Sequence, residues 1–350
     1  MLTPFLDDIE SRIDAGKEEA HFNAWKDFTL GKYRGDVFSP ARGYAVPSTL
    51  AWPKASMNEA VADDEKMILR EFAACSSVLA NGKDAPAIMN VRSNYGPGIL
   101  ASVFGCPIVH LEDHYDSSPQ ATHFGTRDEI KKVLAAGVPD LSKGFGPKVF
   151  AVGERYREIM KMYPKMAKYI HVYHPDLQGP IDTLELLWGS NVFYDMYDDP
   201  VFIKDLLSLI TETYIIFLKK WHALFPPRTD GVSVHWGLMH RGPVMLRNDS
   251  AMNFSPEQYE EFIRPYDQRI FDEFGGGAIH FCGKGSHYIG AMSKMDKLYG
   301  INLSQPHLND MQEIFRATVE KGIPLIGLSK KVVADETTNG RMFHGLVYAA

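Results

Sequence analysis

The fold of this chain is decided by residues 277–285, which read Gly-Ala-Ile-His-Phe-Cys-Gly-Lys-Gly. The apolar run predicts a β-strand, on which alternate side chains share a face, so His280 and Cys282 point the same way. Their α-carbons then lie roughly 6.5–7 Å apart, and both side chains can reach one metal ion. A thiolate beside an imidazole suits zinc better than magnesium or calcium. The alternative is a half-buried histidine beside an inert core cysteine, because two ligands alone do not make a metal site.

Strands and helices alternate around this stretch from about residue 85 to the end of the chain. The sequence predicts strands at residues 85–92, 106–111, 170–174, 231–236, 279–282, 300–304, 323–328 and 346–350. The clearest helix between them begins at Pro200, after Asp199 as N-cap, and places apolar residues three and four apart as far as Trp221. Such alternation implies parallel strands that are joined by crossover helices.

Polar residues follow several of the predicted strands, which is where an eight-stranded α/β barrel places its active site. The pairs are Arg92 and Asn94, Asp176 and Gln178, His235 and His240, and His280 and Cys282. We therefore predict an α/β fold of the (β/α)8 or TIM barrel type, as a single domain over residues 1–350. Residues 61–350 are expected to form the barrel and residues 1–60 an N-terminal cap of helix and loop. An open doubly wound sheet is the alternative, but no phosphate-binding glycine fingerprint follows a first strand.

The composition excludes several classes of protein. The 350 residues carry a formal net charge of -7 and show no basic run with interleaved aromatic residues, which argues against a nucleic-acid partner. No apolar run is long enough to span a bilayer, and the N-terminus lacks the features of a signal peptide. The three cysteines are an odd number in a chain without an export signal, so we expect a reduced, cytoplasmic protein. The oligomeric state stays open.

Several blocks of sequence, taken in order, resemble the uroporphyrinogen decarboxylase superfamily, which includes corrinoid-linked methyltransferases. They are Asp-Leu-Gln-Gly-Pro at 176–180, Leu-Trp-Gly at 187–189, Tyr-Asp-Asp-Pro at 197–200, Ser-Pro-Glu-Gln-Tyr at 255–259, Pro-Tyr at 265–266 and Ile-His-Phe-Cys-Gly at 279–283. The resemblance covers roughly residues 60–330 and implies a barrel fold.

The branches of this superfamily differ in chemistry. The porphyrinogen decarboxylases hold no metal and resemble one another in an Arg-Gln-Ala-Gly-Arg-Tyr block that grips substrate carboxylates. This chain lacks that block, and its nearest candidates, Arg42-Gly43-Tyr44 and Arg92-Ser93-Asn94-Tyr95, each supply one arginine. A substrate with many carboxylates needs several cations. The resemblance is closer to the zinc-dependent, corrinoid-linked methyltransferases, which carry a His-x-Cys pair at this strand.

The resemblance implies that His280 and Cys282 are zinc ligands and catalytic residues. In those relatives the pair and a later cysteine hold zinc, which lowers the pKa of a thiol that then attacks a methyl group on corrinoid cobalt. No cysteine follows Cys282, so we predict His307, just beyond segment 300–304, as the third ligand. The alternatives are His344, which matches the family's order but starts the last predicted strand, a carboxylate, or no metal.

The remaining polar residues receive roles in substrate binding. His235 is predicted to be catalytic. Arg92, Asn94, Asp176, Gln178, His240 and Arg247 are predicted to bind substrate, with an anionic or polar group at Arg92 and Asn94. The alternatives are loop-ordering hydrogen bonds for the histidines, a structural salt bridge for Arg92, turn chemistry for Asp176, and pairing of Arg247 with Asp249.

The predicted function is zinc-dependent methyl transfer between a corrinoid carried by a separate protein and a small donor or acceptor. The partners would be a small-molecule substrate and a corrinoid-binding protein. One alternative is a metal-free decarboxylase (a carboxy-lyase) acting on a porphyrinogen or a smaller acid. A further alternative is a barrel that binds a tetrapyrrole or corrinoid without catalysis.

Overall fold

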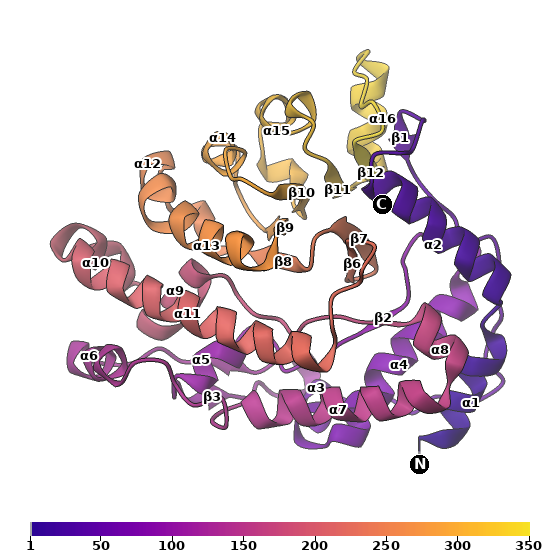
Figure 1. The fold of residues 1–350 in the computed structure, drawn as a ribbon, viewed down its shortest axis with the longest axis horizontal. Coiled ribbons are helices and arrows are strands. Elements are labelled where there is room, and N and C mark those ends of the chain that lie inside the picture. Colours follow the sequence, from indigo (N-terminus) through magenta and orange to yellow (C-terminus); the bar gives the residue numbers. More distant parts are fainter. Residues whose placement is uncertain (1) are drawn as a thin grey trace.

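A computed structural model describes residues 2–350 as a mixed α/β fold (Figure 1). The helices are α1 (Thr3–Arg12), α2 (Ala15–Thr29), α3 (Met57–Ala62), α4 (Asp64–Asn81), α5 (Ile99–Val103), α6 (Arg127–Ala136), α7 (Gly146–Met162), α8 (Pro164–Tyr169), α9 (Pro180–Trp188), α10 (Asn191–Asp198), α11 (Pro200–Leu224), α12 (Pro256–Gln258), α13 (Arg264–Phe274), α14 (Ile289–Met292), α15 (Met311–Ala317) and α16 (Lys330–Thr338). The strands are β1 (Val37–Phe38), β2 (Asn90–Val91), β3 (Ile108–Val109), β4 (Gln120–Ala121), β5 (His171–Val172), β6 (Val232–His235), β7 (Leu238–Arg241), β8 (Val244–Arg247), β9 (Gly277–Phe281), β10 (Leu298–Leu303), β11 (Leu325–Leu328) and β12 (Val347–Ala349).

The main sheet has six parallel strands in the order β1-β12-β11-β10-β9-β8. Strands β2 and β5 form a separate parallel pair, and β3–β4 and β6–β7 are antiparallel hairpins. Strand β1 pairs with β12, so the sheet reaches into the first 60 residues, which the sequence suggested were only a cap. In Figure 1, β8–β12 form an arc in the middle of the molecule, with α13, α14, α15 and α16 on its outer side.

The predicted closed barrel is not confirmed, because the sheet is not closed. Neither β2 nor β5 pairs with the main sheet, and β5 is linked to β8 only through side chains and loop atoms. The Asp176 carboxylate pairs with the Arg247 guanidinium, at 2.5 Å, and the Gly179 N–H donates to the Arg247 carbonyl, at 3.0 Å. The β6–β7 hairpin, which lies between β5 and β8 in the chain, contacts β9, β10 and β11 through β7 instead of joining the sheet. Alternating apolar residues in the sequence indicate a strand, but they do not indicate which sheet the strand joins.

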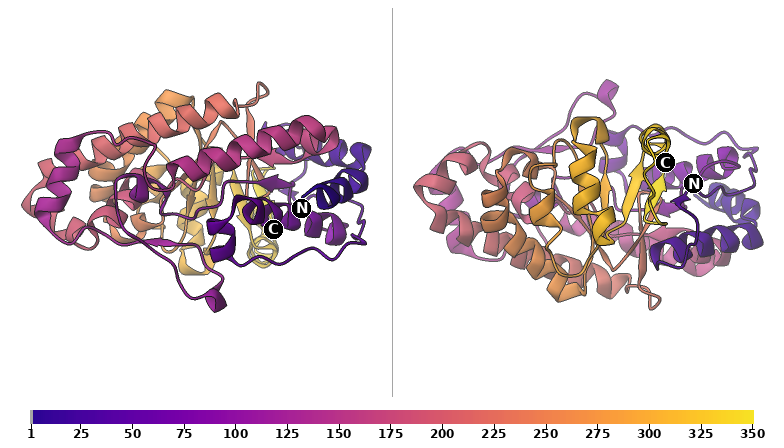
Figure 2. Two further views of the ribbon diagram at one scale, coloured as in Figure 1. Left: turned by 90° about the horizontal axis from the view of Figure 1, so that it is seen from below. Right: turned by 90° about the horizontal axis from the view of Figure 1, so that it is seen from above.

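Helix α11 forms as the sequence predicted. The Asp199 side chain accepts the Phe202 N–H at 3.2 Å, and Pro200 occupies the first turn. The face that the apolar spacing predicted is buried, from Ile203 to Trp221. This face packs partly on α7, where the Phe150 and Phe217 rings lie 4.9 Å apart (Figure 2). Full burial of each large apolar side chain stabilises the folded state by roughly 1.5–3 kcal/mol.

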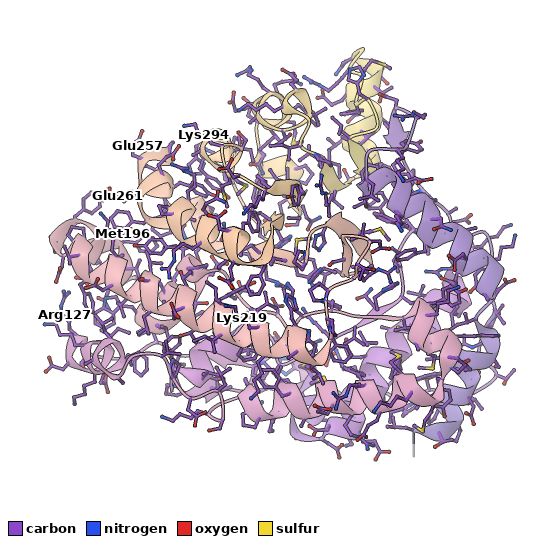
Figure 3. All side chains as sticks on the ribbon, viewed as in Figure 1. Arg127, Met196, Lys219, Glu257, Glu261 and Lys294 are labelled. Atoms are coloured by element: carbon purple, nitrogen blue, oxygen red, sulfur yellow. The ribbon has the colours of Figure 1, made fainter. Side chains whose placement is uncertain are left out.

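The helical segment from Pro256 to Phe274 is interrupted. It begins with a capping box of Ser255 and Gln258, and then passes through a π-helical turn, Tyr259–Ile263, before α13. Pro265 has no N–H to donate to the preceding turn, which explains the local widening. On the outer surface, Lys219 of α11 pairs with Glu273 at 2.5 Å, and Lys204 pairs with Glu261 at 2.6 Å. Figure 3 labels Lys219 and Glu261. Across residues 2–350, no helix combines the length and apolar character that crossing a membrane requires.

Asp267 of α13 is fully buried behind β8, where the Asn248 amide donates to it at 2.6 Å. Burial raises the pKa of Asp267 to about 8. The folded state therefore binds more protons than the unfolded state between about pH 4 and pH 8, and the free energy of unfolding falls as pH rises through that window. We expect Asp267→Asn to remove a slope of about 1 kcal/mol per pH unit.

Urea unfolding at pH 5, 6, 7 and 8 measures this slope as the difference between wild type and variant. Asp272→Asn is the matched control, because Asp272 is exposed on the same helix and pairs with Lys297 at the surface. If Asp267→Asn unfolds with the same pH dependence as the wild type, the raised pKa of Asp267 is contradicted.

Candidate metal centre

Three neighbouring strands present a row of polar side chains to the concave side of the arc. In the register of the sheet, Arg247 of β8 lies beside His280 of β9, and His280 lies beside Asn302 of β10. Residues in register on parallel strands point to the same face. At the start of the two strands, Gly277 allows β8 and β9 to approach, because a Cβ at this position would lie 2.0 Å from the Val244 carbonyl oxygen. Arg247, His280 and Asn302 stand on the sheet itself, and Asp249 and Cys282 follow within two residues of the ends of β8 and β9.

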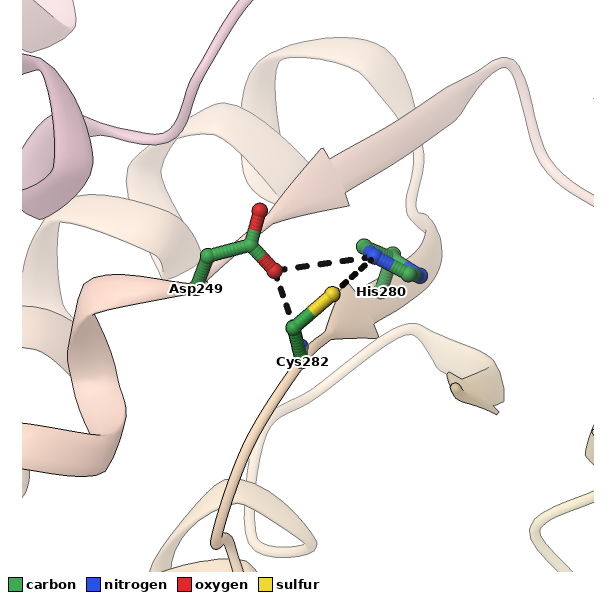
Figure 4. A group of neighbouring side chains, drawn as sticks. All are labelled: Asp249, His280 and Cys282. Atoms are coloured by element: carbon green, nitrogen blue, oxygen red, sulfur yellow. Dashed lines mark hydrogen bonds and ion pairs between the residues drawn. The ribbon is translucent and has the colours of Figure 1, made fainter. Parts of the chain in front are cut away.

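His280, Cys282 and Asp249 form a compact group at the ends of β8 and β9 (Figure 4). Their nitrogen, sulfur and oxygen ligand atoms all lie within 4.8 Å of one another. The Cys282 Sγ is 3.3 Å from the His280 Nε2, which is 3.5 Å from the Asp249 Oδ1. The Cys282 N–H donates to the same Asp249 oxygen at 2.8 Å. Within residues 2–350 this is the group whose donor atoms could hold a metal ion.

Hydrogen bonds fix which nitrogen of His280 faces the group. The Asn302 amide donates to the Ile326 carbonyl, and its Oδ1 lies 2.6 Å from the His280 Nδ1. An amide oxygen only accepts, so the Nδ1 carries the hydrogen and the Nε2 keeps its lone pair. A metal-binding histidine is commonly held by an outer partner in this way.

Hydrogen bonds also hold Cys282 and Asp249 in place. The Ser304 hydroxyl donates to the Cys282 Sγ at 3.1 Å. The buried Asp182 carboxylate accepts the N–H groups of Asp249 and Ser250, at 2.9 and 2.8 Å, and so fixes the turn that carries Asp249. Hydrogen bonds therefore hold all three residues of the group in place without a metal.

The protonation states suit a site that takes up a cation. Burial lowers the pKa of the His280 imidazole, and the Asp249 carboxylate opposes this effect. Burial raises the pKa of the Cys282 thiol. At neutral pH without metal both groups are neutral, so binding of a cation releases the thiol proton.

The donor set fits zinc. Catalytic zinc takes three protein ligands from nitrogen, sulfur and oxygen donors and keeps one position open. The Asp249 side chain is 40% exposed and the His280 side chain 13% exposed, so a substrate can reach the group. A hard cation such as magnesium or calcium would not choose the thiol.

Asp249 is the residue that sequence reasoning assigned differently. Its pairing with Arg247 was considered only as an alternative, but Arg247 pairs with Asp176, and Asp249 turns toward His280. One feature could have indicated Asp249 as a member of this group. It lies two residues beyond the end of β8, and β8 pairs with the strand that carries His280.

The structure does not bring the predicted third ligand, His307, into this group. His307 is exposed in a 3-10 turn, Pro306–Leu308. This turn begins after Gln305, whose side chain binds the Gly283 N–H at 2.7 Å, and the imidazole is left on the outside. His344 is also exposed, in the turn before β12, where its N–H binds Asp36.

Four of the six predicted substrate-binding residues lie together: Arg92, Asp176, Gln178 and Arg247. The Arg92 Nη1 is 2.9 Å from the Asp176 Oδ2, and the Gln178 amide donates to the Asp176 Oδ1 at 3.1 Å. Asp176 thus serves the guanidinium groups of both Arg92 and Arg247. The Asn94 amide donates to Glu71 of α4 at 3.0 Å. The structural salt bridge considered for Arg92 is present, and its role in substrate binding stays a prediction.

The predicted catalytic residue His235 is not part of the metal-binding group. His240 donates from its Nδ1 to the Arg241 carbonyl at 3.1 Å, so its Nε2 accepts from the His235 Nδ1, at 2.7 Å. Burial lowers the pKa of both rings, that of His240 to about 4. The Trp236 ring centroid lies 6.5 Å from that of His235 and 4.9 Å from that of His280. His235 is therefore a buried, neutral residue outside the metal-binding group.

Comparison with known proteins gives a likeness of fold. No family model matches the chain, and no curated protein matches it in sequence. Among solved structures, it is similar to a methyltransferase from Methanosarcina mazei, with a TM-score of 0.63 over 93% of this chain and 91% of that one. The two sequences are 17% identical, so this likeness establishes the common fold and leaves the chemistry to the site itself.

Proposed function

We propose that this chain is a methyltransferase whose active site is a zinc centre formed by Asp249, His280 and Cys282. The observation that carries the proposal is the convergence of one nitrogen, one sulfur and one oxygen donor on a partly open point. A fold shared with a methyltransferase over nearly the whole chain supports it.

The residues of the site have distinct roles in this proposal. Zinc held there would supply Lewis acidity, which lowers the pKa of a thiol or hydroxyl at the open position. Asn302 keeps the His280 Nε2 free of a proton, and Ser304 stabilises negative charge on the Cys282 sulfur. Asp249 adds a formal charge that favours the cation. The Trp236 indole packs edge-on against the His280 ring.

We extend the proposal to the second substrate on the strength of the sequence resemblance. The methyl group would be exchanged with a corrinoid carried by a separate protein, with a small molecule as the other donor or acceptor. Decarboxylation of a porphyrinogen is less well supported, because Arg92 and Arg247 share one internal carboxylate and leave few cations for a polycarboxylate.

The test combines zinc content with methyl transfer. Protein purified without chelator is expected to hold about one zinc ion per chain. With methylcobalamin and a panel of small thiols it should form the methyl thioether and cob(I)alamin, whose absorbance reports turnover. Removal of zinc with a chelator should abolish the reaction, and zinc should restore it. Full activity of the zinc-free protein, or release of carbon dioxide from porphyrinogens at ordinary enzymatic rates, would contradict the proposal.

A further inference from the structure

We infer that a cavity between β5, β6 and the start of β8 is a second binding site, which takes a neutral, single-ring aromatic molecule with one hydroxyl or N–H donor. The cavity has a volume of about 190 Å³. A cavity of roughly 150 Å³ in another protein holds benzene, so this one has room for a ring with a small substituent. The inference goes beyond the proposed function and does not depend on it.

The cavity lies where the sheet fails to close. The Met245 N–H of β8 donates to the His174 Nε2, at 3.2 Å, and two residues further along both segments Arg247 pairs with Asp176. The segment that follows β5 therefore runs beside β8 in the same direction, but no backbone ladder joins β5 to β8. Side chains line the space that such a ladder would fill.

This cavity is separate from the metal centre. It is lined by Pro243, which comes four residues before Arg247, the register partner of His280. Four residues of extended chain span about 13 Å. None of the three residues of the metal-binding group lines the cavity. It thus opens toward the beginnings of the strands, whereas the metal ligands follow their ends.

The walls of the cavity favour an aromatic ligand. They include aromatic rings and prolines, namely Tyr173, Trp221, Phe225, Pro226, Pro227 and Pro243. The rim is exposed at Pro226, Pro227 and Arg228, whereas Tyr173 and His235 are buried. The cavity therefore leads from the surface into the interior, as small-molecule sites commonly do.

The lining residues bring no unpaired charge into the cavity. Arg228 at the rim pairs with Asp230, at 2.8 Å. Burial lowers the pKa of His171 to about 3 and that of His222 to about 4, and it also lowers the pKa values of His174 and His235. The four imidazoles are neutral at pH 7, so a neutral ligand is favoured over an ionised one.

His235 offers a hydrogen-bond acceptor to this cavity, which it lines. The His240 Nδ1 donates to the Arg241 carbonyl, so the His235 Nδ1 donates to the His240 Nε2. The His235 Nε2 therefore keeps its lone pair, and it is buried without a hydrogen-bond partner within residues 2–350. Native proteins rarely leave such an atom unmatched, and a hydroxyl or N–H of a ligand would satisfy it.

The neighbouring imidazole of His174 does not supply the missing donor. Its ring centroid lies 4.3 Å from that of His235, but both of its nitrogens are already engaged. The His174 Nδ1 donates to the Pro175 carbonyl at 2.8 Å, and the Nε2 accepts the Met245 N–H. The donor therefore has to come from a bound molecule.

Fluorine NMR with 4-fluorophenol and 4-fluorotoluene tests this site. The two probes differ in one substituent, and the hydroxyl alone can donate to the His235 Nε2. We expect 4-fluorophenol to bind one site per chain, roughly tenfold or more tightly than 4-fluorotoluene. Its affinity should be the same in zinc-loaded and chelator-treated protein. Equal affinities for the two probes, or binding of 4-fluorophenol that requires zinc, would overturn the inference.

Two variants locate the probe in the cavity. His235→Phe keeps a ring but removes the acceptor, so it should weaken 4-fluorophenol roughly tenfold and leave 4-fluorotoluene unchanged. Ser233 lies two residues before His235, on the same face of β6, and also lines the cavity. Ser233→Leu should fill the space and weaken both probes, and it gives the answer if His235→Phe fails to fold.

Ser77→Leu is the matched control, because Ser77 is exposed on α4, and it should bind both probes like the wild type. The zinc content should stay that of the wild type in all three variants, since none of them changes a metal ligand. Wild-type affinity for 4-fluorophenol in His235→Phe or in Ser233→Leu would refute the site.

Discussion

Replacing Cys282 by serine is expected to lower the affinity for zinc by roughly a hundredfold or more and to abolish methyl transfer. The thiolate is the softest of the three donors and the one that distinguishes zinc from harder cations. A serine hydroxyl stays protonated at neutral pH and would leave the ion with Asp249 and His280 as anchors. Zinc retention in a graded chelator series, measured beside circular dichroism as a check on folding, gives the result.

The two other cysteines provide the controls for this experiment. Cys75 and Cys106 are buried, and burial raises the pKa of each thiol to about 12. Their sulfurs contact the backbone carbonyls of Asn90 and Leu186 and lie outside the metal-binding group. Cys75→Ala and Cys106→Ala should therefore keep zinc and activity, with only the cost of small cavities. Equal zinc affinity in Cys282→Ser and wild type would contradict the metal centre.

Much of the alternation of strands and helices was predictable because it depends on local periodicity, but β7 and β8 were not predicted as strands. The apolar face of α11 and its cap at Asp199 appear as expected, and His280 and Cys282 lie together at the end of β9 as their spacing indicated. Whether the sheet closes into a barrel was not predictable in the same way. Whether β5 and β8 join depends on contacts between distant residues, and the structure bridges them through Asp176 and Arg247.

The place of Asp249 beside His280 was not predicted, for a related reason. Proximity to His280 is set by the register of β8 on β9, which places Arg247 beside His280 and the turn after Arg247 beside Cys282. Register depends on packing across the whole sheet, and a sequence gives little direct sign of it. Chain order favoured His307 because it follows the next strand. The order of residues along the chain does not show in which direction the His307 side chain points from its turn.

The zinc affinities of variants distinguish Asp249 from His307 as the third ligand. Asp249→Ala is expected to lower zinc affinity roughly tenfold to a hundredfold, because it removes one ligand and one formal negative charge. Asp249→Asn keeps an oxygen that can accept the Cys282 N–H but lacks the charge, so its zinc affinity should lie between those of the wild type and Asp249→Ala.

His307→Ala should hold zinc as tightly as the wild type, since His307 is exposed and lies outside the group of donor atoms. Competition with a chelator of known affinity ranks all four proteins on one scale. Steep loss of zinc in His307→Ala, with wild-type retention in Asp249→Ala, would reverse the assignment. It would require the 3-10 turn at Pro306–Leu308 to swing inward when the metal binds, and spectra of cobalt-substituted protein would then show a second imidazole in place of the carboxylate. The order Asp249→Ala below Asp249→Asn, with His307→Ala unchanged, would support a ligand set of one nitrogen, one sulfur and one oxygen.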